Sequence, residues 1–210
     1  MTATARLTDT SRLDDRDPVL DAALAAFLDF GIRRTSMGEI ARRAGISPAT
    51  LYRRYAQKSD VVMAVGLREA QRELSYVDHK VDQSAPPLEQ LVQLYSAVAH
   101  RLRDNQLLQR VLATEPETVL PRLTLEAAPL LDIGHSYLAA FLTRLQSEGH
   151  LPTYDVTPVA DFLTRVAQSE ILTPALGPLD DAATRAFVRD HLAPFIRLNP
   201  EDSAMKAGNR

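Results

Sequence analysis

The strongest constraint on the fold of this chain is the stretch of residues 36–55, SMGEIARRAGISPATLYRRY, which encodes two short helices around a glycine turn. Ser36 followed by a glutamate three residues later forms a capping box, which is typical of a helix start. Gly45 stands just after the first helix, where a left-handed backbone is common. Ser47 then caps a second helix that has Pro48 in its first position. The pattern predicts a helix-turn-helix, a motif whose second helix enters the major groove of DNA.

The charge of this region indicates the kind of partner. Leu51 and Tyr55, four residues apart, can both face a core, which turns the neighbouring side chains of the second helix outward. Between Gly31 and Lys58 seven basic residues oppose one acid, Glu39, so this segment carries +6 while the whole chain carries −3 at pH 7. A local basic patch on an otherwise acidic chain indicates that one small region binds phosphate, and such binding weakens as salt rises.

Short motifs on both sides of this segment follow one another in a fixed order. They are Ala23, Phe27-xxx-Gly31, Thr35-Ser36, Ile40-Ala41, Ala44-Gly45-Ile46-Ser47, Thr50-Leu51-Tyr52, Tyr55 and Lys58. With this order and spacing, residues 17–67 resemble the tetracycline-repressor (TetR) family of bacterial transcription regulators. The resemblance implies an N-terminal DNA-binding domain followed by a divergent C-terminal ligand domain. Arg54, Tyr55 and Gln57 stand where the family often has other residues, a difference that concerns the bases read and not the fold.

The predicted phosphate contacts are made by hydroxyl and ammonium groups, which suit phosphate oxygens. The matching positions in TetR-like proteins bind phosphate, and here they are Thr35, Ser36, Thr50, Tyr52 and Lys58. The alternative for Tyr52 is a half-buried ring that braces the recognition helix.

The predicted base contacts are fewer. Ala49 can place its methyl group against a thymine methyl, and Arg53 can read guanine through two hydrogen bonds. Arg43 and Arg54 fit either a base or a phosphate. The alternative for the arginine pairs is a solvated helix face. The predicted site is completed by the two residues that start the recognition helix, Ser47 and Pro48.

Helical periodicity continues through the rest of the chain. The apolar spacing and the start and stop signals predict an all-α protein, with helices at residues 18–30, 36–44, 47–55, 59–77, 88–103, 106–114, 123–148, 155–172 and 179–196. Pro116 and Pro121 are expected to interrupt the chain before residue 123, and the long helix that follows is expected to break or restart near Pro129.

These elements predict two domains with a free segment at each end of the chain. The expected division is a flexible arm at residues 1–16, a helix-turn-helix DNA-binding domain at 17–62, a ligand-binding and dimerisation domain at 63–198 and a disordered tail at 199–210. Arg6, Arg12 and Arg16 in the arm either contact DNA or form an ordinary solvated segment.

The last two predicted helices carry more apolar surface than one contact face of a surface helix needs. The TetR resemblance implies that they pair in a homodimer, which presents two recognition helices to a palindromic operator in double-stranded DNA. The expected interface residues are Val159, Phe162, Leu163, Val166, Phe187, Val188, Leu192 and Phe195. The alternative is that both helices are buried on all sides within one subunit.

The resemblance also implies a site for a small-molecule effector among the C-terminal helices. The expected lining is mostly apolar with two phenols, and consists of Tyr95, Leu102, Leu108, Leu112, Tyr137, Phe141, Phe162 and Val166. An apolar or amphipathic effector fits this set. The alternative for each of these residues is a place in the helical core. An effector releases DNA only by binding one spacing of the recognition helices better than another.

Signatures of other protein classes are missing from the sequence. The chain has no cysteine and five scattered histidines, none of which has the i, i+4 spacing beside a carboxylate that a helical zinc site requires. It has neither a glycine-rich phosphate loop nor a Gly-x-Ser-x-Gly elbow. We therefore expect no enzymatic activity, no metal and no cofactor. Without an apolar run that spans a bilayer, and without a disulfide framework, a cytoplasmic protein with no membrane partner is expected. A helical ligand-binding or scaffold dimer without DNA binding is the alternative, and the basic second helix argues against it.

Overall fold

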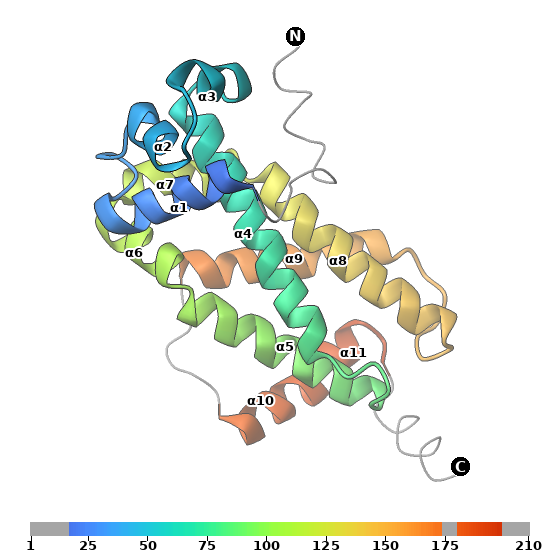
Figure 1. The fold of residues 1–210 in the computed structure, drawn as a ribbon. Coiled ribbons are helices and arrows are strands. Elements are labelled where there is room, and N and C mark those ends of the chain that lie inside the picture. The colour runs from blue at the N-terminus through green and yellow to red at the C-terminus, as the bar shows by residue number, and fades with distance from the viewer. Residues whose placement is uncertain (1–16, 174–179, 199–210) are drawn as a thin grey trace. The chain divides into compact units, whose positions relative to one another are not determined.

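The computed structural model describes residues 17–173 and 180–198, and every element in these ranges is helical (Figure 1). The elements are α1 (Pro18–Phe30), α2 (Met37–Arg43), α3 (Pro48–Arg54), α4 (Lys58–Lys80), α5 (Pro87–Asp104), α6 (Gln106–Thr114), α7 (Pro116–Leu123), α8 (Ala128–Ser147), α9 (Val156–Leu172), α10 (Asp181–Phe187), a π-helical segment (Val188–Leu192) and α11 (Ala193–Phe195). The prediction of an all-α protein is confirmed. The predicted arm with its three arginines, the predicted tail and the predicted helix start at residue 179 lie outside the described residues.

The region around Pro116 and Pro121 differs from the prediction. Pro116 starts α7 instead of interrupting the chain, because the first position of a helix needs no backbone N–H donor. Pro121 lies inside the same short helix. Thr124, with φ −128° and ψ −90°, then ends it. The following long helix begins at Ala128 and not at residue 123, so the predicted restart near Pro129 is confirmed.

The described chain forms two compact units. The first contains the described residues up to Arg72 together with Asn105–Leu130, and the second contains Glu73–Asp104 and the described residues from Leu131 onward. The predicted boundary near residue 62 therefore falls inside α4, which contributes to both units. The first unit is also built from two separate pieces of the chain, because α6 and α7 belong to it.

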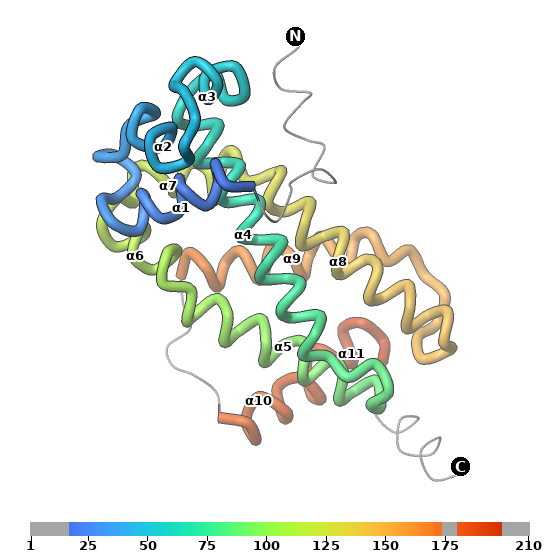
Figure 2. Tube along the Cα trace, in the orientation of Figure 1, coloured from blue at the N-terminus to red at the C-terminus, as the bar shows by residue number. Residues whose placement is uncertain are grey.

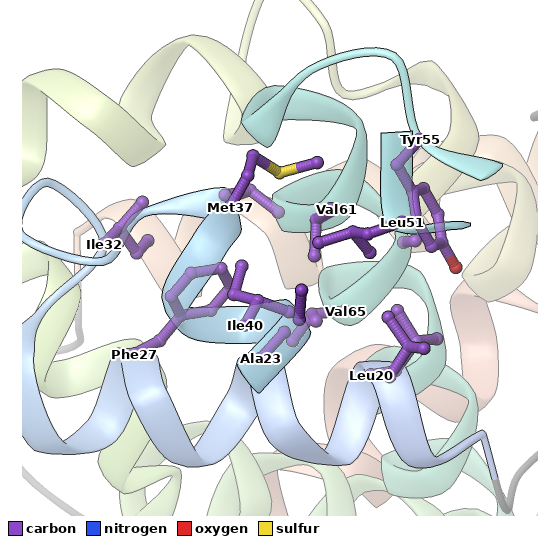
Figure 3. Close-up of a cluster of buried hydrophobic side chains, with 14 of the residues drawn as sticks. Leu20, Ala23, Phe27, Ile32, Met37, Ile40, Leu51, Tyr55, Val61 and Val65 are labelled. Carbon is purple, nitrogen blue, oxygen red and sulfur yellow. The ribbon is translucent and has the colours of Figure 1, made fainter. Parts of the chain in front are cut away.

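Apolar side chains from α1 to α4 converge in the core of the first unit (Figure 3). Leu20, Phe27 and Ile40 are fully buried there, as are Leu51 from α3 and Val61 from α4. The second piece of the chain completes this core with two buried valines and two partly buried leucines: Val111, Val119, Leu107 and Leu112. The helix-turn-helix is thus held by a core to which α6 and α7 contribute.

The second unit has a separate core, to which α5, α8, α9 and the C-terminal helical run contribute. Leu142 and Leu145 of α8 are fully buried in it, as is Ile196. α8 and α9 cross closely (Figure 2). A Cβ placed on Gly134 of α8 would lie 3.1 Å from Cγ2 of Thr164 in α9, so glycine permits the close approach of these two helices.

Candidate DNA-binding site

The two short helices of the predicted motif are present, and each begins at the predicted serine cap. The Glu39 carboxylate of the predicted capping box accepts hydrogen bonds from Arg42 and Arg43 instead. Oγ of Ser36 and Oγ of Ser47 each accept a hydrogen bond from the backbone amide three residues further on, at 3.1 Å in both cases. Gly45 between the helices has φ +67°, a conformation that glycine adopts at low cost. α2 packs on α1 and on α3. The local sequence therefore places α3 on the surface of the first unit with a defined start.

α3 is anchored on one side and open on the other. Leu51 and the following Tyr55 are buried in the first core, which holds the inner face of the helix. The exposed residues of α3 and its cap are Ser47, Pro48, Ala49, Tyr52, Arg53 and Arg54, and Thr50 is partly buried. These residues include most of the predicted DNA contacts. The outer face of α3 is therefore free to meet a partner.

Thr35 differs from the prediction of a phosphate contact. Its side chain is only 1% exposed. The hydroxyl donates within the first unit, where backbone oxygens of Gly31 and Ala26 lie at 2.7 Å and 3.2 Å. Burial of a hydroxyl requires such a partner. The role of Thr35 in this structure is to join the end of α1 to the loop before α2.

Lys58, also predicted to contact phosphate, forms hydrogen bonds within the first unit. Its Nζ donates to the backbone oxygens of Ile32, Arg33 and Thr35, at 2.9, 3.1 and 3.0 Å. An ammonium group has three donors, and all three are engaged. Lys58 therefore fixes the loop between α1 and α2, and no donor remains for phosphate without breaking one of these bonds.

Most of the arginines near α3 are paired with acids of the same unit. Arg42 and Arg43 both donate to the Glu39 carboxylate, at 2.8 to 3.0 Å. Arg43 also reaches Asp29 Oδ2 at 2.7 Å. The guanidinium hydrogen bonds, first from Arg42 and then from Arg43, lower the pKa of Glu39 to about 2. Arg43, the last residue of α2, is therefore paired within the first unit in this structure, and its role as a base or phosphate contact stays a prediction.

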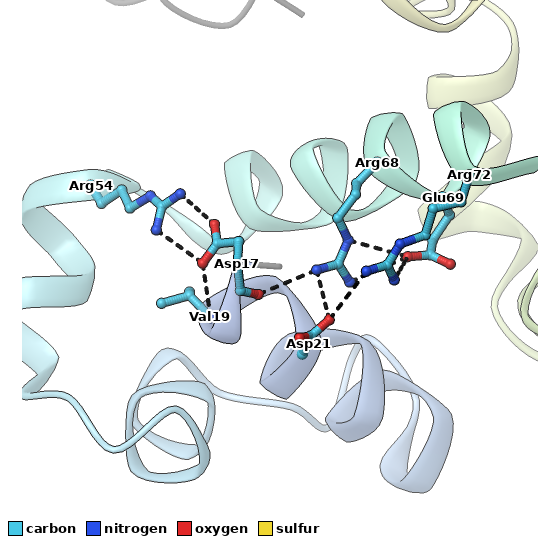
Figure 4. A network of polar contacts seen from close by, with 7 residues as sticks. All are labelled: Asp17, Val19, Asp21, Arg54, Arg68, Glu69 and Arg72. Carbon is cyan, nitrogen blue, oxygen red and sulfur yellow. Dashed lines mark hydrogen bonds and ion pairs between the residues drawn. The ribbon is translucent and has the colours of Figure 1, made fainter. Parts of the chain in front are cut away.

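Arg54 at the end of α3 is paired as well. Its Nη1 donates to Asp17 Oδ1 at 3.0 Å, and its Nη2 donates to Asp17 Oδ2 (Figure 4). The guanidinium also lies over the ring of Tyr55, 5.2 Å from the ring centroid. Both terminal nitrogens of Arg54, a predicted DNA contact, are thus joined to the N-cap residue of α1.

Two exposed arginines of this region have no ionic partner among the described residues. They are Arg53 on the outer face of α3 and Arg34 in the loop before α2. Arg53 is among the predicted DNA contacts, whereas Arg34 is not. The local +6 charge therefore overstates the free positive charge, because intramolecular acids occupy the other guanidinium groups and backbone oxygens occupy Lys58.

A buried arginine lies behind the motif. Arg68 of α4 is 1% exposed, and its Nη1 donates to Asp21 Oδ1 at 2.8 Å and to the backbone oxygen of Asp17 at 3.3 Å (Figure 4). Sequence reasoning missed it, although its spacing from Val61 and Val65 puts it on their apolar helix face. Arg68 therefore ties α4 to the start of α1. One of its partners there is Asp17, the residue that also holds Arg54.

A buried glutamate connects the second piece of the first unit to the loop after α1. Glu115, between α6 and α7, is buried, and its Oε2 accepts a hydrogen bond from the backbone amide of Arg33 at 2.8 Å. Arg33 also pairs with Glu117 at 2.9 Å. Oε1 of Glu115 fills the space beside Gly31, where a Cβ would lie only 2.1 Å away. No local sequence signal identifies this contact, since its partners are 82 residues apart.

The residues predicted to line an effector site are divided between the two units. Leu108 and Leu112 belong to the first unit, where Leu112 packs against the core of the motif. The other six belong to the second unit: Tyr95, Leu102, Tyr137, Phe141, Phe162 and Val166. Phe141 is buried in the second core, while Phe162 and Val166 are exposed. The residues of the predicted set therefore differ in burial and do not all lie in one core.

Tyr137 is the phenol of this set with a defined partner. Its hydroxyl donates to Asp78 Oδ1 at 3.3 Å. Burial, and after it the negative charge of Asp78, raises the pKa of Tyr137 to about 12. The phenol therefore stays protonated at neutral pH and acts as a hydrogen-bond donor.

The predicted dimer residues also separate into two groups. Phe162, Val166 and Phe195 are exposed by 53, 42 and 44%. The rings of Phe162 in α9 and Phe195 in α11 lie 5.0 Å apart, so they form one apolar patch. Val188 is a correction, because it is fully buried in the second core. The remaining four are partly buried and pack against that core: Val159, Leu163, Phe187 and Leu192.

The capped pair of helices, the glycine turn and the open outer face of α3 define a helix-turn-helix DNA-binding protein. The comparison with protein families agrees, because the model described as "Bacterial regulatory proteins, tetR family" matches residues 19–65. An uncharacterized HTH-type transcriptional regulator of Mycobacterium bovis is 32% identical over 160 residues, which cover 76% of this chain and 82% of that protein. A second such regulator, from Mycobacterium tuberculosis, is 29% identical over 92% of this chain and 90% of its own length.

Solved structures share the fold. The transcriptional repressor QsdR of R. erythropolis, from the TetR family, has a TM-score of 0.65 at 20% identity and covers 88% of this chain and 95% of its own. The TetR family repressor AlkX of Dietzia sp. has a TM-score of 0.65 at 18% identity, with 86% and 94% covered. The chain belongs to the TetR family, and it is a transcription regulator and not an enzyme. Within the described residues, no helix is both long enough and apolar enough to span a membrane.

Proposed function

We propose that this regulator is a repressor that binds a palindromic operator as a homodimer and is released by a small-molecule effector bound by its second unit. The observation that carries the proposal is the outer face of α3, which is exposed and bears Arg53, whose guanidinium has no ionic partner in the part of the chain that the structure describes. Ser36, Ser47, Pro48, Ala49, Thr50 and Tyr52 remain the proposed contacts around it. Occupancy of a promoter by such a dimer is sufficient for repression.

Arg53→Ala tests the operator contact. A bidentate arginine–guanine contact contributes about 1–3 kcal/mol of discrimination between bases. The dimer makes this contact once in each half-site, so we expect the variant to bind the operator, recovered by selection from random duplexes, more weakly by roughly 30-fold or more. The preference at one base pair of each half-site should relax. Fluorescence anisotropy with the selected duplex and its single-base variants measures both effects.

Arg103→Ala, which removes an exposed arginine from α5, is the matched control and should bind as the wild type does. An equal loss for all sequences in Arg53→Ala would move Arg53 to the phosphate contacts. If the wild-type protein selects no duplex even at low salt, the proposed function is wrong, and the alternative of a scaffold dimer without DNA binding takes its place.

The patch formed by Phe162, Val166 and Phe195 supports the homodimer. An exposed cluster of large apolar residues on one face is typical of an interaction surface. In TetR-like proteins the last two long helices form the dimer interface. In a two-fold dimer each side chain is buried twice. The interface proposed here is therefore smaller than the predicted one, and it is centred on these three residues.

Phe162→Glu should dissociate the dimer. Burial of a phenylalanine contributes about 1.5–3 kcal/mol, and the change occurs twice per dimer. We expect the dimer dissociation constant to rise by roughly 100-fold or more. Sedimentation equilibrium measures this constant, and circular dichroism checks that the second unit stays folded.

Leu125→Glu serves as the control for Phe162→Glu, because Leu125 is the most exposed large apolar side chain described and lies in the first unit. It should leave the dissociation constant unchanged. A dimer that survives Phe162→Glu and separates on Leu125→Glu would place the interface elsewhere.

The effector proposal rests on the mixed character of the second unit. Tyr95 and Tyr137 bring two partly buried phenols among apolar side chains, and burial raises the pKa of both. Such a set suits an apolar or amphipathic molecule with one or two polar groups. The effector releases DNA only if it binds the two states of the dimer with different affinity.

A further inference from the structure

The basic surface of the first unit is largely neutralised by its own acids. Glu39 pairs with Arg42 and Arg43, Asp29 also pairs with Arg43, and Asp17 pairs with Arg54. Most of these acids lie at the surface, where ion pairs exchange readily with solvent and with other ions. Asp17 differs from them because its carboxylate is almost completely buried.

The Asp17–Arg54 pair has features that hold it together. The Asp17 side chain is 2% exposed, and its two oxygens face the two terminal nitrogens of Arg54 in a bidentate arrangement. Oδ1 of Asp17 also accepts the backbone amide of Val19 at 3.0 Å and caps α1. Arg68 fixes the backbone oxygen of the same residue. Loss of Arg54 would leave a buried carboxylate without its ionic partner, which is costly.

We propose that Asp17 is a positioning residue that withholds Arg54 from DNA. The inference rests on the proposed function and concerns the same surface. Arg53 and Arg54 are neighbours on one short helix, yet only Arg53 has a guanidinium that is free among the described residues. With Arg54 held by α1, the end of α3 presents one mobile cation to the duplex in place of two.

The consequence for DNA recognition follows from the nature of the phosphate contribution. Each phosphate neutralised by a cation adds affinity for every sequence and adds about 0.9 to the salt slope. A guanidinium held by a buried carboxylate adds neither. Asp17 therefore lowers the affinity for every duplex by the same factor and makes binding less dependent on salt, while the contacts that distinguish bases stay unchanged.

Three variants of the full chain test this inference with a mixed-sequence duplex as the probe. Arg54→Met should leave the slope of log Kobs against log salt unchanged. Arg53→Met should reduce it by about 0.9 for each copy of the first unit on the DNA, because on a duplex without the operator the free guanidinium of Arg53 lies against phosphate and not against its guanine. Asp17→Asn keeps a good helix cap but removes the ionic partner of Arg54. This variant should steepen the slope by about 0.9 per copy, which corresponds to roughly a threefold larger loss of affinity between about 50 and about 200 mM salt.

A measurement without DNA completes the test. Arg54→Met should lower the melting temperature, because Asp17 loses its partner, while Arg53→Met should not. If Arg54→Met flattens the salt slope as much as Arg53→Met does, Arg54 binds phosphate and the inference is wrong. An unchanged slope in folded Asp17→Asn also overturns it. If Asp17→Asn does not fold, the comparison of the two methionine variants decides alone. If the wild type binds no duplex at any salt, it is the proposed function that fails.

Discussion

Gly31→Ala should destabilise the first unit by about 3 kcal/mol or more, combining backbone strain with the loss of a buried contact. Gly31 has φ +84° and ψ 162°, a region that is essentially restricted to glycine. The added methyl carbon would also lie 2.1 Å from Oε1 of Glu115. The buried carboxylate must then move and release the amide of Arg33, which it accepts at 2.8 Å. Urea denaturation of the full chain, followed by far-UV circular dichroism, measures the change.

Gly45→Ala is the matched control for Gly31→Ala. Gly45 also has a positive φ, +67°, but a Cβ there meets nothing within 4 Å. Its substitution should cost only about 1–2 kcal/mol. Glu115→Ala completes a double-mutant cycle: it removes the clash, so Gly31→Ala should cost about 1–3 kcal/mol less in that background. If the changes in the free energy of unfolding add in the double variant, the Glu115 carboxylate does not clash with the methyl group added at residue 31.

A chain that ends at Arg72 should fail to form a stable first unit, although it contains the whole helix-turn-helix. It lacks Val111 and Val119, which are buried in the same core as Phe27 and Ile40. Burial of two valines and their neighbours contributes about 5 kcal/mol. That is comparable to the total stability of a small domain. Urea titration of the fragment should therefore show no cooperative transition.

The control for this truncation is a chain in which residues 105–130 are joined to Arg72 through a flexible Gly/Ser linker. It restores Glu115 and both valines without the second unit, and it should recover a cooperative transition. If the fragment ending at Arg72 unfolds cooperatively at the same urea concentration as the linked chain, α6 and α7 are accessory to the first unit. The packing in the shared core would then contribute little.

The local signals in the sequence were sufficient for the elements of the motif. Ser36 and Ser47 predict the two helix caps and Gly45 predicts the turn between them, because a cap or a turn depends on a few neighbouring residues. The apolar spacing of Leu51 and Tyr55 likewise predicts which face of α3 is buried. Family and function followed from the order of these local features.

The partners of the charged residues were not predictable in the same way. Asp17 and Arg54 are 37 residues apart, and Glu115 and Arg33 are 82 residues apart. Neither contact leaves a periodic pattern in the sequence. Counting charges between residues 31 and 58 therefore predicted the right kind of surface but too many free cations. Thr35 shows the same limit, because its hydroxyl is used by a helix that precedes it.

The composite origin of the first unit has a consequence for exchanging DNA specificity between relatives. A chimera made by one crossover at the end of the helix-turn-helix would combine one protein's residues 17–72 with another protein's residues 105–130. Glu115 would then contact the loop after α1 of the other protein, and Val111 and Val119 would pack against the other protein's core residues. A hybrid that keeps both the Glu115 contact and the valine packing must exchange the two segments together. The natural module for transplanting operator recognition is therefore a pair of segments separated in the chain by residues 73–104.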